Sequence, residues 1–135
     1  MKTKREITPK FYQNLGKLFY AVAASDKQVR DEEFNKLKAL VKKQWLNADI
    51  VKDDFNSNAV RQIEYVFEWL HKNEKLNAQM YFDDFINYKN EHPHLFTKNI
   101  RKLIMKTAGA IASSFSGLNK SELIMLAKLD MELKK

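Results

Sequence analysis

The sequence contains no cysteine, and it has only two prolines and three glycines among its 135 residues. Without cysteine the chain has no disulfide framework, no thiolate nucleophile and no cysteine-based zinc site, so histidine and carboxylate chemistry alone remains. The three glycines are isolated from one another, which excludes a glycine-rich phosphate loop. The lack of cysteine is also typical of a reducing compartment, and we expect a cytoplasmic protein.

Long apolar runs and alternating patterns are absent as well. The apolar stretch that follows the basic N-terminus is interrupted by Gln13, Asn14 and Lys17, which argues against a signal peptide or a membrane span. No stretch alternates with a period of two between hairpin turns, so no strand is predicted. Apolar residues recur instead at helical spacing. We predict an all-α, single-domain bundle of six or seven helices over residues 1–135.

Capping and proline signals give the approximate bounds of the helices. Thr8 and Pro9 are typical of a helix start, because the proline at the first helical position lacks an amide that would have no partner there. Asn58 and Asn77 are predicted to cap two helices in the middle of the chain, and Pro93 is predicted to end the second of them. The predicted helices begin near residues 9, 31, 59, 78, 97 and 120.

One pattern occurs twice. Residues 25–33 (SDKQVRDEE) and residues 114–122 (SFSGLNKSE) each follow an apolar helical segment and end on a glutamate. Their aliphatic residues, Val29 and Leu118, stand at the same place in the two copies. We interpret this as an internal duplication of a helix-turn-helix unit, with a middle segment inserted between the copies.

The repeated turn resembles that of the tellurite-resistance TerB-like family, an all-helical fold built from two related hairpins. The family's turn reads Ala-Asp-Gly, one variable residue, an aliphatic residue, Ser, two variable residues and Glu. Asp26, Val29 and Glu33 match this pattern. The resemblance implies a non-enzymatic module of a metal or chemical stress response, with protein partners and a divalent cation at the acidic turn.

The metal site that the resemblance implies would use Asp26 and Glu33. Calcium takes about six to eight oxygen ligands, so these two carboxylates form half a site at most. Lys27 and Arg30 place positive charge beside them, and Phe115 stands where the second turn would need its aspartate. The alternative is that the two acids orient the turn and cap the helix. No other cofactor is predicted.

The middle of the chain contains one further set of metal-binding residue types. Glu64, Glu68 and His71 are spaced by four and three residues, and the Glu-x-x-His pair is typical of helical di-iron sites. Those sites require a second such pair, which this sequence lacks. We therefore predict that the three residues lie on a solvated face, and we predict no catalytic residues.

Basic residues are unevenly distributed. The formal net charge is +7, and residues 97–135 alone carry 8 basic and 3 acidic side chains. Lys98, Arg101, Lys102 and Lys106 fall on one helical face, opposite the apolar one, where they are candidates for binding an anionic partner. Three functions follow from the sequence: a protein-interaction module, a nucleic-acid or anionic-surface binder using residues 98–106, and a metal-responsive domain using residues 26–33.

Overall fold

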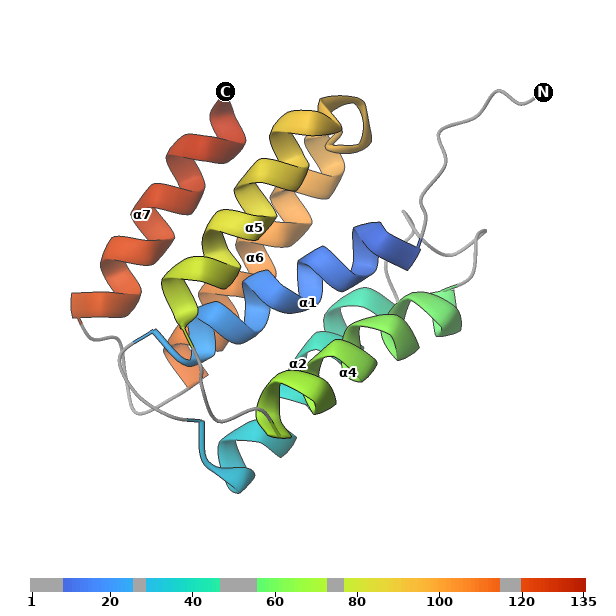
Figure 1. Ribbon diagram of the computed structural model, residues 1–135, viewed down its shortest axis with the longest axis vertical. Coiled ribbons are helices and arrows are strands. Elements are labelled where there is room, and N and C mark those ends of the chain that lie inside the picture. Colours follow the sequence, from blue (N-terminus) through green and yellow to red (C-terminus); the bar gives the residue numbers. More distant parts are fainter. Residues whose placement is uncertain (1–8, 26–28, 47–55, 73–76, 115–119) are drawn as a thin grey trace.

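The computed structural model describes residues 9–25, 29–46, 56–72, 77–114 and 120–135. These residues form six α-helices and one 3₁₀ turn, and they contain no strand (Figure 1). The elements are α1 (Pro9–Ala23), α2 (Asp31–Leu46), α4 (Asn56–Lys72), α5 (Ala78–Glu91), η1 (Pro93–Leu95), α6 (Lys98–Ser114) and α7 (Lys120–Lys134). The all-α prediction is confirmed.

Helix α1 lies at the centre of the bundle. It crosses between the pair α2 and α4 on one side and α5, α6 and α7 on the other (Figure 1). Its main contacts are with α4 and α5, and it also touches α6 and α7. With neighbours on several sides, α1 buries Tyr12 and Tyr20 in addition to the apolar residues Phe11, Leu15, Leu18, Phe19 and Val22. It is therefore a core helix rather than a surface helix with one apolar face.

The close approach of α1 and α4 depends on Gly16. A Cβ atom added there would lie 3.1 Å from Cβ of Val66 and 3.2 Å from the carbonyl oxygen of Ile63. Beside this contact, the amide of Gln13 donates a hydrogen bond to Oε1 of Gln62 over 3.1 Å. The helix propensity lost at Gly16 is thus offset by close packing between the two helices.

Helix α2 begins at Asp31, as the acidic cluster predicts, and packs against α4 and α6. Glu33 occupies its third position, and the backbone amide of Arg30 donates to Oε1 of Glu33 over 3.1 Å. This is the reciprocal half of a capping box, so Glu33 has the capping role given above as the alternative to metal binding. Val29 is buried, as the repeat predicts, whereas Leu118 lies outside the described residues.

Of the two caps predicted for the middle helices, one is confirmed and one is wrong. Asn77 caps α5, because its Oδ1 accepts a hydrogen bond from the amide of Met80 over 3.1 Å. The prediction for Asn58 is wrong, since α4 begins two residues earlier, at Asn56. Asn56, Ser57 and Asn58 are all of capping type, yet all three lie inside α4, so residue type alone does not locate the start of this helix.

The helix pairs α1–α2 and α6–α7 occur where the duplication predicts two units, but they pack differently. Helix α6 lies against α7, whereas α1 makes its main contacts with α4 and α5. Helices α2 and α6 are joined inside the core by the indole of Trp45, which donates to Oγ1 of Thr107 over 3.0 Å. The inserted middle segment therefore separates the first pair and becomes part of one shared core.

Candidate anionic-partner site

Three of the four predicted basic residues line the outer edge of α6. Lys98, Lys102 and Lys106 are exposed and recur every four residues, so they follow one another along the helix over about 12 Å. None of them has an ion-pair partner within the part of the chain that the structure describes. Their charge is available to a ligand.

Arg101, the fourth predicted residue, is half-buried and has a structural contact. Its Nη1 donates a hydrogen bond to the carbonyl oxygen of Leu133 over 2.7 Å. Lys89 of α5 makes a similar contact, because its Nζ donates to the carbonyl oxygen of Glu132 over 2.6 Å. Both cations thus satisfy carbonyl groups at the C-terminal end of α7, where the helix dipole favours positive charge. They hold that end of α7 against α5 and α6.

A pocket of about 460 Å³ opens between α6 and α7 beside these contacts. Its lining consists of Lys98, Arg101, Lys102 and Met105 from α6 and Asp130, Leu133 and Lys134 from α7. Leu133 is buried and Met105 is half-buried, so they form its apolar floor, while the exposed lysines stand at its rim. Asp130 is paired with Lys134 over 3.0 Å, which compensates its negative charge. The pocket therefore suits an apolar group that carries or adjoins an anion.

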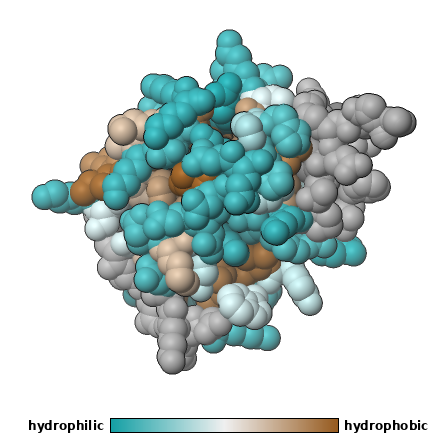
Figure 2. Space-filling model, turned by 45° about the horizontal axis from the view of Figure 1, so that its top comes forward, coloured by the Kyte–Doolittle hydropathy of each residue, from teal (hydrophilic) through white to brown (hydrophobic). Residues whose placement is uncertain are grey.

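This end of the bundle, where α6 begins and α7 ends, comes forward in Figure 2. Hydrophilic side chains cover most of that view, and apolar side chains are visible between them (Figure 2). A mixed surface of this kind provides both charge and apolar contact to a ligand. It differs from a uniformly charged surface, which attracts ions without binding apolar groups.

The acidic turn does not form a metal centre within the described residues. Asp26 lies outside them, and Glu33 accepts the backbone hydrogen bond that caps α2. The guanidinium of Arg30 also lies 4.0 Å from Glu33. Among the described residues, no group of three or more histidine, aspartate or glutamate side chains is placed to hold a metal ion.

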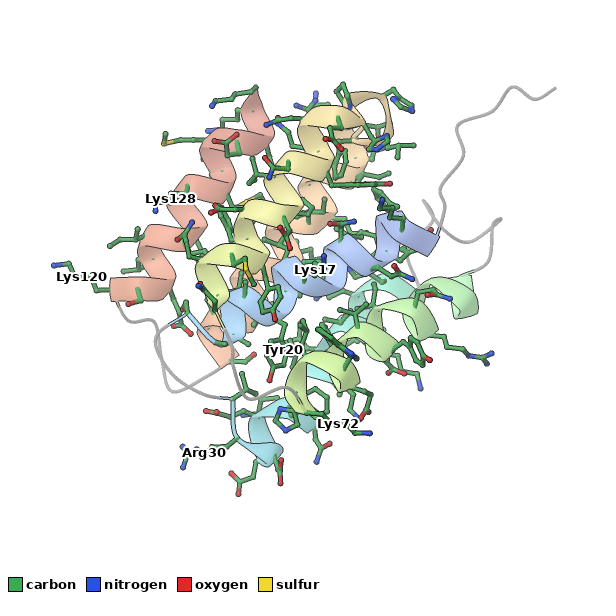
Figure 3. The ribbon with its side chains drawn as sticks, viewed as in Figure 1. Lys17, Tyr20, Arg30, Lys72, Lys120 and Lys128 are labelled. Carbon is green, nitrogen blue, oxygen red and sulfur yellow. The ribbon has the colours of Figure 1, made fainter. Side chains whose placement is uncertain are left out.

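The prediction of a solvated face is wrong for His71. Its Nδ1 lies 2.9 Å from the hydroxyl of Tyr20, and its Nε2 lies 2.9 Å from Oδ1 of Asp31. The imidazole also stacks on the ring of Phe34, with 4.0 Å between centroids and 4° between planes. Figure 3 shows Tyr20 between α1 and α4. His71 follows Phe67 by four residues, so its position beside the apolar stripe was visible in the helical spacing.

The surroundings of Tyr20 disfavour ionisation of its phenol. Burial raises its pKa to about 12, and the nearby Tyr81 adds to the increase. The phenol therefore stays protonated near neutral pH and donates to His71, whose other nitrogen donates to Asp31. Glu68, the remaining carboxylate near His71 in sequence, pairs instead with Lys38 over 3.0 Å. The arrangement is a structural link between α1, α2 and α4.

No family model matches the chain, and neither a curated protein nor a solved structure is detectably similar to it. Within the described ranges, every helix is too short or too polar to cross a membrane. The surface that α6 and α7 form is therefore the main indication of function.

Proposed function

We propose that this chain is a non-enzymatic, TerB-like helical module that binds an acidic partner protein between α6 and α7, as part of a stress-response system. The observation that carries the proposal is the pocket itself, in which an apolar floor lies beside Lys98 and Lys102, two exposed lysines without ion-pair partners among the described residues. Electrostatic attraction brings an acidic partner to such a surface, and apolar contact retains it.

The apolar floor favours a protein segment over a nucleic acid. Met105 and Leu133 offer a place for an aliphatic or aromatic side chain, which a phosphate backbone does not possess. Among the described residues no aromatic side chain lines the pocket, so they offer no stacking of the kind that retains single-stranded bases. The spacing of the α6 lysines nevertheless suits phosphates, and a nucleic-acid or anionic-surface binder remains the second candidate.

The test uses a fluorescent 16-residue peptide of glutamate and serine as an acidic probe. We expect the double variant Lys98→Glu/Lys102→Glu to bind this peptide about tenfold more weakly or worse, because two attractive charges become repulsive. The control is Lys42→Glu/Lys43→Glu, which makes the same change in net charge on the exposed face of α2. We expect the control to lose less than about threefold.

Two results would overturn the proposal. An equal loss of affinity in both double variants would show that the probe responds to net charge alone. Binding of a single-stranded oligothymidylate, lost in Lys98→Glu/Lys102→Glu, with no binding of the peptide, would favour the nucleic-acid candidate. Vesicles of phosphatidylcholine with phosphatidylserine, compared with phosphatidylcholine alone, test an anionic surface in the same way.

A further inference from the structure

Helix α7 is apolar on two sides. Its inner side buries Met125, Leu129 and Leu133 against the rest of the bundle. On its outer side Leu123, Ile124 and Met131 remain 50%, 48% and 63% exposed. A surface helix normally carries apolar residues on one side only, and a contiguous exposed apolar patch marks an interaction site. The outer side of α7 therefore needs an explanation other than core packing.

The exposed apolar residues form a continuous stripe. Leu123, Ala127 and Met131 follow one another at intervals of four residues, which places them along one line on the helix. This outer stripe adjoins the α6–α7 pocket, since Asp130 and Lys134 stand three residues after Ala127 and Met131 and are their neighbours on the helix surface. The stripe and the pocket form one surface rather than two.

The charges beside the outer stripe indicate the sign of the partner's charge. The α6 lysines stand across the pocket, and Lys120 and Lys128 point away from the bundle on α7 (Figure 3). A second copy of this chain would bring another basic surface to this one, and each copy carries a net charge of +7. Charge complementarity therefore selects an acidic occupant over self-association.

The shape of the surface indicates the form of the occupant. Helix α7 has 15 residues and is about 22 Å long, and the pocket lies beside its C-terminal end, on the α6 side. One turn beyond Met105 on α6, a Cβ atom added at Gly109 would meet nothing within 4 Å, so this surface stays open along the helix. A long surface with an apolar centre and a charged edge fits a helix with one apolar face.

We propose that the outer stripe of α7 and the α6–α7 pocket together bind an acidic amphipathic helix of a partner protein. This inference rests on the proposed function and adds the form of the partner. The apolar face of the partner helix covers Leu123, Ala127 and Met131, and one of its large side chains enters the pocket. Its carboxylates pair with the lysines on the edge of α6.

The experiment compares two fluorescent 16-residue peptides that contain the same glutamate, alanine and leucine residues. In the first peptide the leucines recur at intervals of three and four residues, and in the second they are distributed around the helix. We expect the full chain to bind the first peptide about tenfold more tightly, because only that peptide presents one apolar face. Amide shifts in ¹⁵N spectra should then concentrate on α6 and α7.

A pair of double variants locates the apolar contact. Leu123→Ser/Met131→Ser should reduce the advantage of the first peptide by about fivefold or more, since it removes two apolar side chains of the stripe. The matched control is Tyr65→Ser/Trp69→Ser, which removes exposed apolar surface on α4. We expect the control to change the affinity less than about twofold. All four residues are exposed, so folding should be retained, which circular dichroism verifies.

The outcomes separate this inference from the proposed function. If both peptides bind equally and Lys98→Glu/Lys102→Glu weakens both, the acidic-partner function stands and the helical form is wrong. If neither peptide binds, both proposals fail. Amide shifts centred on α4 would overturn the inference, because the peptide would then bind another surface. A dimer in sedimentation equilibrium that Met131→Ser dissociates would also overturn it, because the occupant would then be a second copy of this chain.

Discussion

The hydroxyl of Tyr20 lies 2.9 Å from Nδ1 of His71, and these two residues are 51 positions apart in the sequence. Through the other ring nitrogen, the same imidazole reaches Asp31 at the start of α2. Three helices that are distant in sequence are thus joined by two hydrogen bonds and one stacked ring pair. Because the tyrosine is buried, this link makes stability depend on pH in the alkaline range.

Stability should fall between about pH 10 and pH 12 because of Tyr20. Its pKa is raised from 10.0 to about 12 in the folded protein, so the unfolded chain releases the proton first. The contribution is complete below about pH 10 and is lost as the pH approaches 12. The Tyr20→Phe variant has no ionisable group at this position. Between these pH values the free energy of unfolding of the wild type should therefore fall, relative to that of the variant, by up to about 2–3 kcal/mol. Urea denaturation at several pH values measures the difference, and a constant difference would contradict the prediction.

Two glycine-to-alanine substitutions should have opposite effects. In Gly16→Ala the new methyl group would meet Val66 and the backbone of Ile63, so we expect a loss of about 1–3 kcal/mol. In Gly109→Ala the methyl group meets nothing within 4 Å, so we expect a gain of about 0.5–1 kcal/mol from helix propensity. Thermal and urea denaturation measure both. A gain at position 16 would show that α1 and α4 separate readily.

Thr107→Val should destabilise the contact between α2 and α6. The hydroxyl of Thr107 accepts from Trp45 and donates to the carbonyl oxygen of Leu103 over 2.8 Å, and valine has the same shape without it. The buried indole N–H would lose its partner, at a cost of about 1–3 kcal/mol. Thr107→Ser keeps the hydroxyl and serves as the control. Unfolding followed by tryptophan fluorescence measures both, and a larger loss for serine would assign the effect to the methyl group instead.

Lys89→Met should loosen the end of α7. The substitution keeps the apolar stem and removes the ammonium group that bonds the carbonyl oxygen of Glu132. We expect a loss of about 1–2 kcal/mol and faster amide exchange over the last turn of α7, because that carbonyl group keeps only the 3.3 Å hydrogen bond from the amide of Lys135. The control is Lys128→Met, at an exposed position of α7 itself. Equal exchange in the two variants would contradict the role given to Lys89.

Features that depend on neighbouring residues were predictable from the sequence. The start of α2 at Asp31 and the cap at Asn77 follow from local chemistry, and the structure has both. Asn58 was predicted wrongly because residues of capping type also occur inside a first helical turn, and α4 already begins at Asn56. The face that carries Lys98, Lys102 and Lys106 was also predictable, since helical spacing alone places them together.

Features that depend on contacts between distant segments were not predictable. Arg101 belongs to the basic face by its spacing, yet its hydrogen bond goes to a carbonyl group 32 residues away. His71 has two partners on other helices, and the sequence shows only its neighbours on its own helix. The pocket arises where the end of α7 lies beside the start of α6, and no local pattern encodes that contact. Spacing predicted which residues share a face, whereas tertiary packing determined what each face meets.

The central place of α1 has a consequence for the order of events during translation. This helix leaves the ribosome well before the helices that cover it, because α4 and α5 lie within residues 56–91. Until then a nascent helix with apolar side chains around most of its circumference has no native partner, which exposes it to aggregation and to chaperones. A ribosome-bound chain that stops after α2 should therefore be held by chaperones, and one that includes α5 should be released.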